Sequence, residues 1–280
     1  MSVLITGAAG FIGSHLAKLY TSPLCCDIRN DKMIQPLNLI DCIVTNPPET
    51  IFHLGAVSST TETDTALISK NNVTLSCELL EKCIDLKIPF IYASSASVYG
   101  HGDHGFFEST RMTPLNYYAM SKAYFDSIVI QKIKDNPGAK IIGLRYFNVY
   151  GKNEDHKGDM ASPVHKFLNQ STQDKEIKIF EGSADYLRDF VHIDDVITMT
   201  QKSVDFPSGI YNVGTGIPRS FLDVATIIAG VTGAKITEIP FPEYLRGKYQ
   251  KWTCSSNAKI GKCLTLKRMS LEKGIKEVAT

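Results

Sequence analysis

The sequence has 280 residues, of which 43% are hydrophobic and 21% are charged, as in one large globular domain or two small ones. Thirty basic and twenty-nine acidic residues leave a formal charge of +1, so no overall field attracts nucleic acid or an anionic membrane. No apolar run approaches the ~20 residues of a membrane span. A strand-like run begins already at Val3, so we expect no signal peptide.

The seven cysteines are scattered along the chain and form no C-x-x-C pair. This spacing excludes a structural zinc site, and we expect no metal. An odd number of cysteines in apolar segments is typical of reduced thiols, which predicts a cytoplasmic protein.

The first half of the chain alternates continuous apolar runs with helical patterns. We expect strands at Val3–Thr6, Leu24–Asp27, Thr50–Leu54, Pro89–Ser94 and Lys140–Tyr146. Helical spacing predicts helices at Phe11–Tyr20, Leu67–Leu86 and Tyr118–Ile133. Strands that are apolar throughout are buried on both faces, so the pattern predicts an α/β fold with a doubly wound, Rossmann-type parallel sheet.

The sequence becomes more polar after Tyr146. We therefore expect an NAD(P)-binding domain at residues 1–150 and a smaller α/β substrate-binding portion at 151–280, with a strand at Ile177–Glu181. A strand and helix at Asp189–Val204 suggest that residues 193–215 return to the first domain.

A glycine-rich turn joins the first strand to its helix. Gly7 allows a tight turn, Gly10 allows a pyrophosphate to approach the backbone, and Gly13 allows the helix to pack on the strand. Asp27 ends the next strand, where an acidic residue would bind the adenosine ribose. Because strand, glycines, helix and acid occur in this order, a nucleotide site is favoured over a turn without a ligand.

The same region leaves the choice between NAD and NADP open. Asp27 would accept a hydrogen bond from a free ribose 2′-hydroxyl and would repel a 2′-phosphate, which favours NAD. Arg29 and Lys32 would neutralise a phosphate, which favours NADP, unless they are ordinary solvated charges.

Tyr118 and Lys122 are four residues apart and therefore share one face of a helix. We expect the lysine ammonium to lower the pKa of the phenol towards neutrality, so that the tyrosine serves as a general acid/base. A serine-rich strand end at 94–97 offers a hydroxyl that would hold the substrate against the tyrosine.

With these features the chain resembles the extended short-chain dehydrogenase/reductase superfamily, which includes the nucleotide-sugar epimerases and dehydratases. The resemblance implies a triad of Ser95, Tyr118 and Lys122, with Ser94 and Ser97 as the alternatives to Ser95. Dehydratases carry an Asp-Glu pair where this chain has Ala96-Ser97, so dehydration is disfavoured. A Cys and His pair typical of GDP-fucose synthases is also missing, because no cysteine lies between Ser94 and Gly151.

Several segments resemble the ADP-glyceromanno-heptose 6-epimerases more particularly. They are Ser-Ser-Thr-Thr-Glu at 58–62, His-Lys-Gly-Asp-Met-Ala-Ser at 156–162 and Gly-Lys-Tyr-Gln at 247–250. The resemblance implies oxidation of the heptose at C6 to an aldehyde with bound NADP, followed by re-reduction on the other face. It also implies that Lys157 is the second acid/base beside Tyr118, although a loop or phosphate contact is the plainer alternative.

By the same resemblance, further residues would line the two ligands. Those near the cofactor, with Tyr118 and Lys122, are Gly7, Gly10, Phe11, Ile12, Gly13, Asp27, Arg29, Leu54, Gly55, Ala56, Val57, Ser58, Asn71 and Val149. Those near the nucleotide-sugar, with Ser95, are Asn148, Asp159, Lys166, Phe180, Glu181, Gly182, Ser183, Arg188 and Tyr249. Arg188 suits a diphosphate, and its alternative is an ion pair with Asp185 or Asp189.

The chain also departs from the family pattern. Asp159 replaces the usual serine, Lys166 replaces a histidine, and the segment after Asp27 is short. These departures keep two alternatives open: another nucleotide-sugar 4-epimerase or reductase, and a nucleotide-binding protein without catalysis. The resemblance finally implies a homo-oligomer, for which Leu67–Leu86 and Tyr118–Ile133 are candidate interface helices.

Overall fold

The computed structural model describes residues 2–102, 104–243 and 250–280. Contacts divide the chain into two units, each assembled from separate segments. The first comprises Met1–Val98, Pro114–Arg145 and Ile197–Tyr211. The second comprises Tyr99–Thr113, Tyr146–Val196 and Asn212–Thr280.

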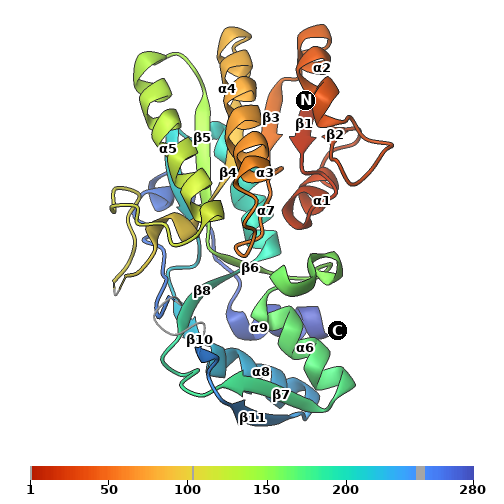
Figure 1. The fold of residues 1–280 in the computed structure, drawn as a ribbon, viewed down its shortest axis with the longest axis vertical. Helices are drawn as coiled ribbons and strands as arrows, with labels where there is room; N and C mark the ends of the chain where they lie inside the picture. The colour runs from red at the N-terminus through yellow and green to blue at the C-terminus, as the bar shows by residue number, and fades with distance from the viewer. Residues whose placement is uncertain (1, 103, 244–249) are drawn as a thin grey trace. The chain divides into compact units, whose positions relative to one another are not determined.

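A six-stranded sheet with the order β2-β1-β3-β4-β5-β9 forms the centre of the first unit (Figure 1). Its strands are β1 (Val3–Thr6), β2 (Leu24–Cys26), β3 (Thr50–His53), β4 (Phe90–Ser95), β5 (Ile141–Tyr146) and β9 (Gly209–Val213). The pairs β1–β2, β1–β3 and β3–β4 are parallel. Every residue of β1, β3 and β5 is buried, which means that helices cover both faces. The expected Rossmann-type sheet is confirmed.

The helices of this unit follow the expected pattern with shifted ends. They are α1 (Phe11–Ala17), η1 (Pro36–Asn38), α2 (Leu39–Thr45), α3 (Thr65–Ile68), η2 (Ser69–Thr74), α4 (Leu75–Asp85), η3 (Ala96–Tyr99), α5 (Tyr117–Asp135), α7 (Ile193–Lys202) and η5 (Ser203–Asp205). The helix expected at Leu67–Leu86 is thus α3 and α4 joined by a π-helical turn, η2. Its apolar face packs with α5 and the sheet in one core, which includes Leu79, Leu80, Phe125 and Val129.

The second unit has two small sheets. One has the order β10-β8-β6, from β10 (Pro218–Ser220), β8 (Leu187–His192) and β6 (Asn148–Tyr150), and the other pairs β11 (Lys235–Ile239) with β7 (Glu176–Phe180). Its helices are η4 (Asp155–Met160), α6 (Pro163–Gln173), α8 (Phe221–Thr232), η7 (Ile260–Lys262) and α9 (Leu271–Ala279). A separate core joins them, with Val164, Ile177, Val224, Ile228 and Ile275 among its buried residues.

The strand and helix expected at Asp189–Val204 divide between the two units. Strand β8 pairs parallel with β6 and antiparallel with β10, so it belongs to the second unit. Helix α7 from Ile197 and strand β9 as far as Tyr211 belong to the first. None of the helices in the described part of the chain has the length and apolar character needed to cross a membrane.

Candidate active site

The glycine turn between β1 and α1 has the close backbone approach that its sequence predicts. Gly7 has a φ of +68°, and a Cβ there would lie 2.6 Å from the backbone nitrogen of Gly55. A Cβ on Gly13 would lie 2.1 Å from the carbonyl oxygen of Gly7. Gly10 is the N-cap of α1 and offers no side chain to the first amides of the helix. This cradle fits the pyrophosphate of a dinucleotide.

Asp27 and Arg29 form an ion pair beside this turn. The nearly buried Asp27 carboxylate accepts hydrogen bonds from the backbone amides of Ala9 and Arg29, at 3.0 and 2.9 Å, and from Arg29 Nε at 3.2 Å. Burial opposes ionisation of Asp27, but the contacts with Arg29 outweigh it and hold its pKa below the ordinary value. The guanidinium lies over the turn, since Arg29 Nη2 would be 3.2 Å from a Cβ on Gly10. Lys32 is exposed.

The loop after β3 is fastened by Asn72, a residue that the sequence analysis missed. Its fully buried amide accepts from Val57 N at 2.8 Å and donates to Val57 O and to Ser121 Oγ on α5. Asn71, the expected cofactor residue, instead donates to Leu67 O within its own helix. The adjacent pair Asn71-Asn72 is the feature of the sequence that could have revealed Asn72. Neighbouring residues of a helix point in different directions, so Asn72 can face the core while Asn71 faces solvent. Val149 lies on β6 of the second unit.

Ser95, Tyr118 and Lys122 come together in the first unit, at the end of β4 and the start of α5. Tyr118 is hydrogen-bonded to the side chain of Ser95. Ser95 Oγ also accepts hydrogen bonds from Ser97 N at 3.2 Å and Ser97 Oγ at 2.9 Å, which leaves its own proton for the tyrosine oxygen. Lys122 is buried and donates from Nζ to Ala93 O at 2.7 Å.

The neighbouring serine points the other way. Ser94 Oγ donates to Asp126 Oδ2 at 3.0 Å. The fully buried Asp126 also accepts from Tyr92 Oη at 2.7 Å and from Arg145 Nε at 2.8 Å. Alternation along β4 therefore separates Ser95, which faces Tyr118, from Ser94, which belongs to this buried network. The sequence analysis missed Asp126, although it follows Lys122 by one helical turn.

Burial disfavours the charged form of both members of the pair. It raises the pKa of Tyr118 above its ordinary value, and the hydrogen bond from Ser95 offsets part of the rise. It lowers the pKa of Lys122 to about 8, against the opposing effect of Asp126. The expectation that Lys122 would bring the pKa of the phenol towards neutrality is therefore wrong for this structure.

Lys157 lies in the second unit, within η4. Its Nζ donates to Oε2 of the fully buried Glu154 at 2.7 Å. The two residues that depart from the family pattern also contact each other, because Lys166 Nζ donates to the backbone oxygen of Asp159 at 2.7 Å. Asn148 lies on β6, where it pairs with Phe190 of β8.

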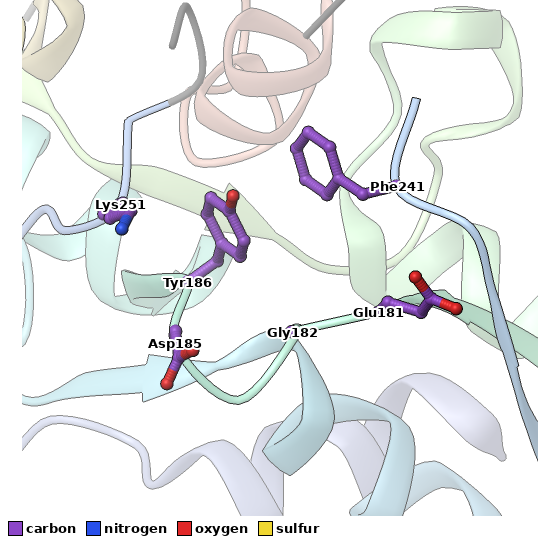
Figure 2. Close-up of a pocket in the computed structure, with 6 residues that line it drawn as sticks. All are labelled: Glu181, Gly182, Asp185, Tyr186, Phe241 and Lys251. Carbon is purple, nitrogen blue, oxygen red and sulfur yellow. The ribbon is translucent and has the colours of Figure 1, made fainter. Parts of the chain in front are cut away.

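A hollow of about 320 Å³ opens in the second unit (Figure 2). Six residues line it, namely Glu181, Gly182, Asp185, Tyr186, Phe241 and Lys251. The rings of Tyr186 and Phe241 are nearly parallel, with centroids 5.2 Å apart. The hollow thus combines aromatic surface with groups of both charges.

The other expected substrate residues lie around this hollow or close to it in the chain. The Phe180 ring contacts Phe241 with centroids 5.5 Å apart, and Ser183 is buried. Arg188 is also buried; it donates to the backbone oxygens of Leu187 and Gln250 and lies over the Phe221 ring at 5.4 Å. Asp189 accepts from Thr215 and Ser255. Tyr249 lies outside the described residues.

A Rossmann-type unit with a glycine turn and a Ser-Tyr-Lys triad defines a class of nucleotide-dependent enzymes. The chain belongs to the NAD dependent epimerase/dehydratase family, whose model matches residues 3–214. It is 41% identical to the ADP-L-glycero-D-manno-heptose-6-epimerase of Brachyspira hyodysenteriae, over 92% of this chain and 90% of that protein.

Two solved structures extend the comparison. The Helicobacter pylori ADP-L-glycero-D-manno-heptose-6-epimerase is 31% identical, with a TM-score of 0.87 over 99% of this chain and 94% of that one. MoeE5 in complex with UDP-glucuronic acid and NAD is 26% identical, with a TM-score of 0.84 over 100% and 98% of the two chains. The family expected from the sequence is confirmed, and the nicotinamide cofactor is that of the family.

Proposed function

We propose that the protein is a nucleotide-sugar epimerase that interconverts ADP-D-glycero- and ADP-L-glycero-D-manno-heptose at C6. The observation that carries the proposal is the hydrogen-bonded pair of Tyr118 and Ser95, with Lys122 one turn along the same helix. This arrangement occurs in a chain 41% identical to a protein named for that activity.

The reaction removes and restores a hydride at C6 and a proton at the hydroxyl oxygen of that carbon. Because C6 of a heptose is bonded to C5 and C7, its oxidation gives a ketone, which replaces the aldehyde of the sequence-based expectation. Bound NAD(P) would take the hydride from C6 and return it to the opposite face. Tyr118 exchanges the hydroxyl proton on one face, Ser95 holds the oxygen, and Lys122 supports the tyrosine.

The opposite face needs a second acid/base, and we assign this role to Lys157. An amine accepts the hydroxyl proton in one direction, and an ammonium donates it in the other. Its Nζ donates to the carboxylate of Glu154. The nucleotide would occupy the hollow lined by Tyr186 and Phe241, whose rings offer a stacking surface for a base.

We propose NADP as the preferred cofactor, because the charge of Asp27 is already paired. Arg29 lies over the glycine turn, so its half-exposed guanidinium is placed to bind a 2′-phosphate that Asp27 alone would repel. Removing Arg29 should weaken NADP binding at least ~10-fold and change NAD binding little. Titration of Arg29→Ala with both cofactors tests this, with Lys32→Ala as the control; an unaltered protein that binds NAD as tightly as NADP would contradict it.

We further propose a homo-oligomer in a reducing compartment such as the cytoplasm. All seven cysteines are unpaired in the described chain. Helix α5 exposes Tyr117, Met120 and Tyr124, an apolar stripe that a second copy would cover.

The first experiment incubates the purified protein with ADP-D-glycero-D-manno-heptose, without added cofactor, and separates the C6 diastereomers by chromatography. We expect interconversion with retained cofactor, or on addition of NADP. If a folded protein that binds NADP or NAD leaves this substrate unchanged, the ADP-heptose assignment fails.

The second candidate is a 4-epimerase or reductase on another nucleotide-sugar. The observation that favours it is Asp159, held through its backbone by Lys166 where the family has other residues. A reductase would consume NADPH in proportion to product, whereas an epimerase would not. The same incubation, repeated with UDP-sugars and followed at the absorbance of NADPH, separates the two.

A further inference from the structure

Glu154 is a fully buried carboxylate with a donor at each of its four lone-pair positions. Oε1 accepts from Gly151 N at 3.2 Å and from Ser162 Oγ at 2.6 Å. Oε2 accepts from Ser162 N at 2.7 Å and from Lys157 Nζ at 2.7 Å. A buried carboxylate is strongly destabilising unless it is paired and hydrogen-bonded, so these contacts hold one another in place.

The four contacts fix a particular stretch of chain. Gly151 follows strand β6, and Ser162 is the N-cap of helix α6, where its hydroxyl also accepts from His165 N. Through these contacts Glu154 links the two ends of the loop between β6 and α6. Lys157 follows Glu154 by three residues within that loop, and its backbone nitrogen donates to Glu154 O at 2.9 Å. Both ends of the lysine, backbone and ammonium, are thus held by one residue.

We infer that Glu154 is a positioning residue: its ion pair holds the Lys157 ammonium in place, so that Lys157 donates a proton in the half of the cycle in which the C6 ketone is reduced. This inference rests on the proposed function, which makes Lys157 an acid/base. In that direction Tyr118, as its phenolate, would first take the hydroxyl proton while the bound nicotinamide cofactor would take the hydride from C6. When the hydride returns to the opposite face, the N–H bond of the ammonium breaks as the O–H bond at C6 forms, which leaves a neutral amine beside Glu154. Because Lys157 is 22% exposed, water returns the proton.

Other charges near the loop are engaged elsewhere. Asp155 is 88% exposed and lies 3.7 Å from His165 Nε2 of α6. Lys166 of the same helix donates to Asp159 O. His156 is exposed. Glu154 presents its carboxylate to Lys157 Nζ at 2.7 Å.

The test compares Glu154→Gln, which removes the charge and keeps the shape, with Asp155→Asn, which removes a neighbouring exposed charge. We expect Glu154→Gln to lower kcat for epimerisation at least ~10-fold with little change in KM. The alkaline limb of its pH–rate profile should move down by about one pH unit or more, because the ammonium has lost its partner. Asp155→Asn should leave both unchanged, and Glu154→Asp should restore part of the limb. A Glu154→Gln profile that matches that of the unaltered protein overturns the inference.

A second readout does not depend on the substrate. Acetylation of Lys157, followed by mass spectrometry, should be slower than acetylation of the exposed Lys152 in the unaltered protein, because Glu154 holds Nζ, and should become faster in Glu154→Gln. If Glu154→Gln does not fold, the comparison with Lys152 decides, and faster acetylation of Lys157 overturns the inference. Lys157→Met separates the two proposals: if it epimerises normally, the role of Lys157 fails, whereas unmoved acetylation in Glu154→Gln defeats the positioning by Glu154.

Discussion

At the scale of single residues, burial acts on Tyr118 and Lys122 in opposite directions. It raises the pKa of the phenol and lowers that of the ammonium to about 8, since both charged forms lose hydration. At neutral pH the pair therefore consists of a phenol and a mostly charged amine. To take the hydroxyl proton of C6, Tyr118 must first become a phenolate, the form that the hydrogen bond from Ser95 favours.

Removing the phenol hydroxyl should abolish this exchange. We expect Tyr118→Phe to lower the rate of epimerisation at least ~10²-fold, the usual contribution of a general acid/base. The neighbouring Tyr117 is about half exposed, so Tyr117→Phe is the matched control and should retain activity. Initial rates from separated diastereomers check both variants. Equal activity in the two variants would mean that the phenol of Tyr118 transfers no proton in the reaction.

His53 makes a second prediction, on stability against pH. It is buried between Thr6 Oγ1, at 2.7 Å, and Ser76 Oγ, at 2.8 Å. Burial, with a smaller effect of the Lys122 charge, lowers its pKa to about 3. Between pH 3 and the ordinary value near 6.5, the unfolded chain binds a proton at this site that the folded chain does not. Stability is therefore full above pH 6.5 and falls as the pH drops through this window.

From pH 7.5 to pH 5, we expect this histidine to reduce the free energy of unfolding by about 2 kcal/mol. Urea denaturation followed by circular dichroism measures the change, because Trp252 lies in the second unit and does not report on the first. His53→Gln should flatten the dependence on pH, whereas His15→Gln should not. A His53→Gln protein with the same slope would disprove the assignment.

At the scale of elements, the turn between β1 and α1 illustrates how closely the strands and helices approach. The Gly7 carbonyl lies where a Cβ on Gly13 would be, so helix α1 can pack on its strand only through glycine. Gly230 in helix α8 is the opposite case, since a Cβ there would meet nothing within 4 Å. One chain thus contains a helical glycine that geometry requires and one that it does not.

The two glycines should respond to alanine with opposite signs. Gly13→Ala should lower the free energy of unfolding by about 2 kcal/mol and weaken nucleotide binding, because the turn must open to admit the methyl group. Gly230→Ala should raise it by about 0.5–1 kcal/mol, the usual gain from alanine within a helix. Urea denaturation and a cofactor titration measure both. Comparable stability of the two variants would show that the turn accommodates a methyl group at position 13 without loss of stability.

The same scale decides what the sequence could predict. Continuous apolar runs predicted five strands of the six-stranded sheet and not β9, because burial on both faces leaves a signal in the sequence that does not depend on the neighbouring strand. The sheet to which β8 belongs could not be predicted, since periodicity identifies a strand and not its neighbours. In the site, the spacing of four residues was enough to predict that Tyr118 and Lys122 lie one turn apart on the same helix. The choice between Asn71 and Asn72 needed the helix orientation, and Glu154 was overlooked although it lies one turn before Lys157.

At the scale of the whole chain, neither unit is a continuous stretch of sequence. The first unit takes in Pro114–Arg145 and Ile197–Tyr211, and the second takes in Tyr99–Thr113. Each unit nevertheless has its own core of buried apolar residues. A single boundary near residue 150 describes where the texture of the sequence changes. A single boundary cannot show that each unit is assembled from separate segments of the chain, because tertiary packing decides which unit a segment joins.

The last prediction concerns the surface that the first unit leaves apolar. Tyr117, Met120 and Tyr124 follow helical spacing on α5, with exposed fractions of 48%, 52% and 60%. Leu67, on the neighbouring α3, is also exposed at 41%. Pairing this face with that of a second copy would remove apolar area from water, at about 25 cal/mol for each Å² buried. A two-fold contact suffices, because the same face serves both copies.

A charge in the middle of the stripe should therefore separate the copies. We expect the unaltered protein to have at least twice the mass of one chain in light scattering after size exclusion, and Met120→Glu to have the mass of one. Leu37→Glu, at a site 91% exposed and outside the stripe, is the matched control and should keep the oligomer. Retained mass in Met120→Glu would rule out α5 as the interface. Because Met120 lies between Tyr118 and Lys122 in the chain but faces outward, its activity as a monomer would show whether association supports the pair.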